Sequence, residues 1–447
     1  MAKKNTKKRV RQPQKQSSYI FILIPLFVLV IKLIVMANTK NGGWLGADGE
    51  NYLAGVDGLL KDGLFSKESK LLFWPAGYPI ILAIFAKISI ANLLWITSIV
   101  QSLFYAYASY YFVEQIRKTK LAPLAFLTAL LLGFNPTLSL SSLAVGYESP
   151  IAAALLLVCA LLIQEKNSLS KSILIGALLG FSSFMQPRYL LVGLVLILLR
   201  VLFSNAKKAA LLGAAVSVVV MFISPASLIY RNNVANDVNS ISTNLGTTMR
   251  IGAGDGVTGG YDDKNKSVPC EPKTPGAVVT DNDLVKCVLN WYVSNPTATI
   301  KLAYNKSVFF WSPWSGPLAN GTMARNPWLK VNPVVDIQKT QSGYNLIVGP
   351  FGKIVSWLWL LGGLALLALG TWWLHKIGGY ARTLAWIAAA PILLSWLISL
   401  GTIGDHRFRI PTMGLSLFLQ VAGVFALRNR LKSSEFVPTF EQSARAR

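Results

Sequence analysis

Acidic side chains are concentrated in a short polar stretch, residues 43–63, that follows the first long apolar run. It holds Asp48, Glu50, Asp57 and Asp62 in a chain with only 19 acids against 43 Lys and Arg. A carboxylate held at a membrane interface can bind a metal or another cation, or take a proton from a hydroxyl. Asp48 is the first candidate for such a base. Its alternative role is to cap the helix that we expect to begin beside it.

A second group of candidates is basic and lies at the ends of apolar runs. Its members are Arg188, Arg231, His406, Arg407 and Arg409. A single arginine in such a place is usually an anchor whose side chain snorkels to the interface. Several bases on the membrane face opposite the one predicted for positive charge favour an anionic ligand, such as a phosphate or pyrophosphate.

The candidate acids need elements that hold them at the membrane surface. Apolar residues from Tyr52 to Leu60 recur at helical spacing, which predicts a short amphipathic helix on that surface, with Asp48 at its start. Glu148 lies at the outer end of another apolar run, where Ser149 and Pro150 predict a helix start. The helix dipole alone would account for an acid at that place.

Composition indicates a polytopic α-helical membrane protein. Of 447 residues, 53% are hydrophobic and 14% are charged, and several runs approach or exceed the roughly 18 apolar residues that suggest a spanning helix. We expect about ten spans, within a range of roughly nine to thirteen. The ten are residues 19–36, 93–113, 121–134, 151–163, 172–185, 190–203, 209–230, 354–374, 384–400 and 410–427.

The basic residues predict which side each loop faces. The formal charge of +24 is concentrated in the tails and in alternate links between apolar runs, which is typical of cytoplasmic loops and not of a nucleic-acid surface. With the ten spans above, both termini and the basic links lie in the cytoplasm. If residues 74–90 also spanned the membrane, the basic links after them would lie outside, against this rule. We therefore expect 74–90 to form a re-entrant or juxtamembrane helix on the outer side.

These assignments divide the chain into five parts. They are a basic cytoplasmic tail (1–18), an N-terminal membrane module (19–230) with the first outer loop at 38–92, an extracytoplasmic domain (231–353), C-terminal membrane helices (354–427) and a cytoplasmic tail (428–447). The composition of 231–353 predicts a mixed α/β fold. Cys270 and Cys287 both lie in it, and outside the cytoplasm they are expected to form a disulfide.

Three stretches resemble one family: GADGENYLAGVDGLLKDG with FWPAGYPIILAIF, SPASLIYRNNV with the segment that follows it, and DHRFRIPTMGLSLFLQVAG. In this order and spacing they are similar to membrane glycosyltransferases of the GT-C class. The closest branch holds the dolichyl-phosphate-mannose–protein mannosyltransferases and the bacterial aminoarabinose transferases. The resemblance implies a GT-C-like fold with outer-side juxtamembrane helices.

The resemblance also implies an activity. Such enzymes move a sugar, with inversion, from a polyprenyl-phosphate donor to a glycan, lipid or protein acceptor on the outer face of the membrane. Asp48 stands at the position of the catalytic base, and Arg231, Arg407 and Arg409 match residues that hold the donor phosphate. Further candidates for substrate binding are Glu50, Tyr52, Glu148, Arg188 and His406.

Metal dependence stays open at this stage, with Mg²⁺ or Mn²⁺ on Asp48 and Glu148 as the arrangement to test. The expected partners are the sugar donor, its acceptor and membrane lipids, with no nucleic acid. The expected location is a bacterial plasma membrane, with the active site facing outside. Two alternatives to an enzyme are a lipid-phosphate transporter or flippase, and a non-catalytic subunit of a complex that assembles cell-envelope glycans.

Overall fold

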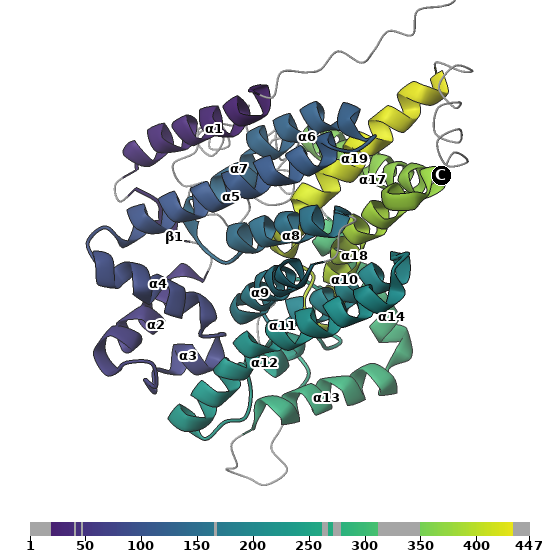
Figure 1. The fold of residues 1–447 in the computed structure, drawn as a ribbon. Coiled ribbons are helices and arrows are strands. Elements are labelled where there is room, and N and C mark those ends of the chain that lie inside the picture. Colours follow the sequence, from purple (N-terminus) through teal and green to yellow (C-terminus); the bar gives the residue numbers. More distant parts are fainter. Residues whose placement is uncertain are drawn as a thin grey trace, which may run out of the picture.

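The structure of the chain is a computed structural model. It describes residues 19–39, 42–45, 48–164, 168–261, 267–270, 279–311 and 349–431. Regular structure in these ranges is almost entirely helical (Figure 1). Many apolar side chains on the outer helices are exposed. Long apolar helices with exposed apolar surface are typical of an integral, multi-pass membrane protein.

Five described helices are long and apolar enough to cross a membrane. They are α1 (Ile20–Ala37), α11 (Lys207–Asn236), α17 (Pro350–Ile377), α18 (Gly379–Gly401) and α19 (Ile410–Leu431). A sixth span is formed if α4 (Gly77–Ile88) and α5 (Leu93–Arg117) are taken together. The chain bends by 117° between these two helices, so α4 does not continue into α5 as one straight helix.

Four shorter apolar helices coincide with four of the spans expected from sequence. They are α6 (Ala122–Phe134), α8 (Glu148–Ile163), α9 (Leu169–Met185) and α10 (Tyr189–Phe203). With 13 to 17 residues each, they reach only about 20–26 Å at 1.5 Å per residue. The described residues therefore support five or six spans by length and composition, and the figure of about ten stays a prediction.

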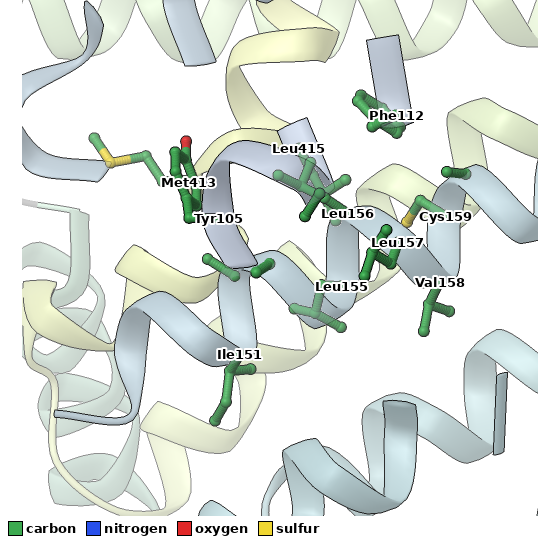
Figure 2. Packing of buried hydrophobic residues seen from close by; sticks show 14 of the residues in the cluster. Tyr105, Phe112, Ile151, Leu155, Leu156, Leu157, Val158, Cys159, Met413 and Leu415 are labelled. Carbon is green, nitrogen blue, oxygen red and sulfur yellow. The ribbon is translucent and has the colours of Figure 1, made fainter. Parts of the chain in front are cut away.

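Helix α8 is the centre of the fold. Each of its 16 residues is buried, because it packs against α5, α9, α18 and α19. Figure 2 shows its side chains among Tyr105 and Phe112 of α5 and Met413 and Leu415 of α19. A helix that is apolar on every side needs neighbours on every side. This position fixes Glu148, its first residue, at one end of the protein core.

The helix α19 also packs along α17. A side-chain carbon at Gly370 would lie 1.9 Å from the carbonyl oxygen of Leu419, and one at Gly423 would lie 2.1 Å from that of Leu366. Only glycine permits so close an approach of two helix backbones, as is common between helices in membranes. The contact fixes the position of α19, and with it the arginine segment that precedes α19.

The only described strands form a parallel pair, and the first of them lies in region 38–92. The strand β1 (Trp44–Leu45) pairs with β2 (Ala144–Val145), with Trp44 opposite Ala144 and Leu45 opposite Val145. The helices α2 (Gly49–Asp62) and α3 (Ser69–Phe73) follow β1, and α7 (Pro136–Ser141) precedes β2. In Figure 1, α2, α3 and α4 form a group beside the main helix bundle.

The regular structure in the described part of region 231–353 is helical, so the expected mixture of helices and strands is not seen there. Its helices are α12 (Leu245–Ile251), α13 (Asp281–Ser294) and α14 (Pro296–Trp311). A disulfide joins Cys270 to Cys287, whose Cα atoms are 6.0 Å apart, and Met249, Ala253 and Val288 pack with them in a small core. Residues 312–348, which hold part of the predicted domain, lie outside the described ranges.

Candidate functional site

Two carboxylates and one guanidinium meet at one end of the helix bundle. The Nη1 of Arg407 donates a hydrogen bond of 2.7 Å to Oδ2 of Asp48, and its Nε donates to Oε1 of Glu148. The three side chains are only 10–18% exposed. In such a poorly solvated place electrostatic interactions are strong, and removing one partner typically costs about 3–5 kcal/mol. We call Asp48, Glu148 and Arg407 the central cluster.

Asp48 does not act as a helix cap. It occupies the residue before α2, but its side chain makes no capping hydrogen bond and points to Arg407 instead. Among the described residues its second oxygen, Oδ1, has no hydrogen-bond partner. The capping role that could have explained Asp48 is therefore absent, and one carboxylate oxygen stays available to accept a proton.

Glu148 is positioned by a buried hydrogen-bond network that holds the backbone before it. Gln101 donates through Nε2 to the Ala144 carbonyl at 3.1 Å, and Tyr78 donates to Gln101 at 3.4 Å. The Tyr78 hydroxyl in turn accepts a hydrogen bond of 2.9 Å from the Gly146 backbone N–H. A side-chain carbon at Gly146 would lie 2.4 Å from Oε2 of Glu148. Position 146 therefore has to be glycine for the carboxylate to lie where it does.

Arg407 lies on the short 3₁₀ helix η4 (His406–Arg409), which leads into α19. Asp405 caps η4, because its Oδ1 accepts a hydrogen bond of 2.9 Å from the Arg407 backbone N–H. The guanidinium also lies over the ring of Tyr147, at 5.4 Å from the ring centre. A cation over an aromatic face is stabilised by the ring quadrupole. Backbone and side chain of Arg407 are thus both held in place.

Arg188 contacts the same short helix from α10. Its guanidinium lies 3.9 Å from the centre of the Phe408 ring, so it packs on η4 between the two candidate arginines. His406 is buried on η4, with its Nδ1 3.7 Å from Oδ1 of Asp405. Of these two predicted site residues, His406 therefore lies on the short helix that carries Arg407, and Arg188 packs against that helix.

Arg409 lies at one end of an apolar groove of about 420 Å³ between α6, α17 and α19. Leucines from all three helices line the groove, including Leu127, Leu364 and Leu417. The guanidinium of Arg409 also lies 5.7 Å from the centre of the Trp311 ring. An apolar groove that ends at an arginine suits an amphiphile with a long apolar chain and an anionic head group.

Arg231 has a different environment from the one expected for a phosphate ligand. Its Nε donates to the Leu64 carbonyl at 3.1 Å, and Nη1 donates to the Leu71 carbonyl at 3.4 Å and to Asn232 Oδ1 at 2.8 Å. Its Nη2 donates to the Ser66 carbonyl. These bonds use four of the five N–H groups of an arginine. Arg231 therefore ties α11 to the chain around α3, and its donors are occupied by backbone.

Two candidates on α2 behave differently from each other. Glu50 is exposed and has no ion pair among the described residues, so the structure does not bring it into the central cluster. Tyr52 is buried and packs edge-on against Trp74 and Tyr78, with ring centres 6.4 and 5.1 Å away. Burial raises the pKa of Tyr52 well above its usual value. The phenol is thus neutral at ordinary pH and is a poor candidate for a base.

The described residues do not fit a divalent metal. Asp48 and Glu148 converge, but they converge on a guanidinium that uses one oxygen of each. No group of three or more His, Cys, Asp or Glu able to hold a metal occurs in the described ranges. A cation placed between these acids would be next to the positive charge of Arg407. No chemical step below is therefore assigned to a metal.

Sequence reasoning missed several residues that support the cluster. Lys32 lies inside the first apolar run and is fully buried, where its Nζ donates a hydrogen bond of 2.8 Å to Ser142, two residues before β2. Gln101 is also buried in an apolar helix. The signal was present in the sequence, because a charged or amide side chain inside a spanning run is costly and generally has a specific partner.

The helices of region 231–353 hold the segment between α18 and η4. The fully buried Lys306 of α14 donates to the Leu400 carbonyl at 2.9 Å and to the Tyr292 hydroxyl at 2.8 Å. Tyr292 of α13 donates to the Gly401 carbonyl at 3.1 Å, and the Gly404 N–H donates to the Gly259 carbonyl at 2.9 Å. The helices and turns of this region thus position the backbone that leads to Arg407.

No protein-family model matches the chain, and no curated protein matches it. Among solved structures, it is similar to the archaeal oligosaccharyltransferase AglB from Archaeoglobus fulgidus, solved with an inhibitory peptide and a dolichol-phosphate, at a TM-score of 0.47 and 10% identity. The match covers 96% of this chain and 53% of AglB, so the chain spans about half the length of that protein. A similarity of this degree does not by itself assign a family or an activity.

Proposed function

We propose that the chain is a membrane glycosyltransferase that uses a polyprenyl-phosphate sugar as donor and transfers the sugar to an acceptor on the outer face of the membrane. The observation that carries the proposal is the arrangement of the central cluster beside the groove of Arg409. Asp48, a carboxylate with a free oxygen, is bound by Arg407. Arg407 lies on the short helix η4, two residues before Arg409, which heads an apolar groove. The resemblance of the sequence to GT-C enzymes supports the same function.

In this proposal the apolar groove holds the prenyl chain, and Arg409 holds the phosphate. The acceptor hydroxyl or amine attacks the anomeric carbon of the sugar from the face opposite the phosphate. A bond forms between the acceptor atom and that carbon, while the bond from the carbon to the phosphate oxygen breaks. The acceptor proton passes to Oδ1 of Asp48, and polyprenyl phosphate leaves. One displacement inverts the configuration at the anomeric carbon.

Arg407 has two roles in this scheme. Its Nη1 and Nε hold Asp48 and Glu148 in place. Its Nη2 is buried and has no hydrogen-bond partner among the described residues. A buried donor without a partner is costly, and an oxygen of the departing phosphate would satisfy it. Developing negative charge on the leaving group is stabilised by such preorganised donors.

The orientation of the chain is part of the proposal. Helix ends carry Arg117, Lys171, Lys207 and Lys376. Given the alternation of the helices along the chain, these ends are opposite those that carry Asp48, Glu148 and Arg407. Positive residues mark the cytoplasmic side. The central cluster is therefore proposed to face the outside, with region 231–353 on the same side.

The test is a direct assay of the purified full chain. Synthetic polyprenyl phosphates that carry different sugars are supplied with a panel of lipid, glycan and peptide acceptors, and the release of polyprenyl phosphate is measured. Release that requires both an acceptor and Asp48 supports the transferase. Movement of an intact donor across a vesicle membrane, without release of polyprenyl phosphate, would support a transporter instead.

A further inference from the structure

Arg407 lies between two carboxylates in the way that a divalent cation lies between two acids in a metal site. Its Nη1 and Nε donate to one oxygen of Asp48 and one of Glu148. Both acids follow the paired strands β1 and β2, so their convergence is built into the backbone. Cations such as Mg²⁺ are often bound by one or two carboxylates together with water. Without the guanidinium, this pair of acids would suit such an ion.

We infer that the guanidinium of Arg407 is the resident cation of this site, and that it excludes a divalent metal. An arginine stays charged at every physiological pH and fits two carboxylates through its fork of N–H groups. It binds one oxygen of each acid, and its charge repels a second cation at short distance. Because it is covalently attached, it is present at any metal concentration.

The inference depends on the proposed function only for its consequence, which is that sugar transfer requires no added metal. The inference itself concerns cation binding and can be measured without a sugar donor. It predicts that the site becomes a metal site when Arg407 is removed. The backbone that carries the two acids would then keep its position, because the strands and the Tyr78–Gln101 network that hold it do not involve Arg407.

The experiment measures binding of Mn²⁺ to the full chain in detergent by electron paramagnetic resonance, which distinguishes free from bound Mn²⁺. The variants are Glu148→Gln alone, and Arg407→Ala and Arg407→Met, each with and without Glu148→Gln. Arg428→Ala serves as a control at the far end of α19. We expect wild type and the control to show no binding that depends on Glu148. Removal of Arg407 should strengthen Mn²⁺ binding by at least about tenfold, and Glu148→Gln should abolish that gain.

Two results would overturn the inference. One is Mn²⁺ binding by the wild type that is lost on Glu148→Gln, which shows that Arg407 does not exclude the metal. The other is a folded Arg407 variant that binds no Mn²⁺, which shows that the acids are not a cation site. If neither variant elutes as a folded protein, the wild type and Glu148→Gln comparison still decides the first point. Failure of every sugar donor would contradict the proposed function and would leave these binding results unaffected.

Discussion

Asp48 and Glu148 occupy equivalent positions relative to the paired strands. Leu45 lies opposite Val145 in the parallel pair, and each acid follows its strand residue by three positions. Each acid also stands at the start of a helix, α2 or α8. Parallel strands in register carry equivalent positions in the same direction, so the pair brings the two carboxylates to the same place, where Arg407 meets both.

The Asp48→Asn variant should remove most transfer activity while leaving the protein folded. A positioned base typically contributes about 10²–10⁴-fold to the rate. Asparagine keeps the shape and can still accept a hydrogen bond from Arg407, and the Asp48 side chain has no capping role to lose. The measurement is the rate of polyprenyl-phosphate release, together with the thermal unfolding midpoint.

The matched control is Asp57→Asn, which changes an exposed acid on helix α2 and should be active. A stable Asp48→Asn protein with a near-normal rate would make Glu148 the next candidate.

The Gly146→Ala variant should displace Glu148 and reduce the transfer rate. The new methyl group would start 2.4 Å from Oε2 of Glu148, which is well inside contact distance, so the carboxylate has to shift from its present position. We expect a loss of activity of at least about tenfold, since small displacements of catalytic groups are costly. Gly401→Ala is the control, because nothing lies within 4 Å of its added carbon. Equal activity of the two variants would show that the placement of Glu148 is not needed.

Some of this site follows from sequence, and some of it does not. The candidates Asp48, Glu148 and Arg407 are predictable because charged residues at the ends of apolar runs are few. Their convergence is not predictable, because Arg407 lies 359 positions from Asp48 and 259 from Glu148. The strand pair that aligns the acids is only two residues long on each side, which is too short for any periodic pattern.

The fold shows a similar division. Apolar runs predict which segments form the helix bundle, yet run length does not determine whether a segment of 13 to 17 residues spans on its own. Arg231 illustrates a further limit. An arginine at the end of an apolar run has the same sequence pattern whether it binds a phosphate or backbone carbonyls, and here it binds carbonyls. Only the three-dimensional arrangement separates the two.

The Arg409→Ala variant should weaken binding of the lipid donor and leave the amount of folded protein unchanged. Arg409 is the charged residue at the end of the apolar groove, and a lysine there would be a poor substitute at a phosphate. The measurement is the donor concentration for half-maximal rate, for Arg409→Ala, Arg409→Lys and the distant Arg428→Ala. We expect a rise of at least about tenfold in the first variant. An unchanged value would return Arg409 to the role of a membrane anchor.

Region 231–353 should face the outside and keep its disulfide there. The bond between Cys270 and Cys287 closes a segment with a sequence separation of 17, and a loop of that size is worth about 3 kcal/mol in the chain-entropy estimate. A membrane-impermeant thiol reagent applied to intact cells should label the two cysteines only after reduction. Cys159 is buried in α8 and should not react. Labelling without reductant would contradict the disulfide, and failure to label after reduction would contradict the orientation.

Lys306 should make the stability of the protein depend on pH. Burial lowers the pKa of its ammonium group from 10.5 to about 7, so the unfolded chain binds this proton more tightly than the folded one. The cost of burying the charge is complete below pH 7, falls as the pH rises from 7 towards 10.5, and vanishes above that range. Wild type is therefore expected to gain stability across this window.

The Lys306→Met variant isolates this effect, because methionine can fill the buried space without a charge. Relative to wild type, the variant should be most stable at pH 6, by at most about 5 kcal/mol, since each pKa unit corresponds to about 1.4 kcal/mol. The hydrogen bonds lost to Tyr292 and Leu400 reduce this difference. Unfolding midpoints of both proteins, measured between pH 6 and 9.5, should converge as the pH rises.

The control is Lys301→Met, which alters an exposed lysine of the same helix and should show no such trend. A difference between Lys306→Met and wild type that stays constant across this range would mean that Lys306 keeps its ordinary pKa in the folded protein.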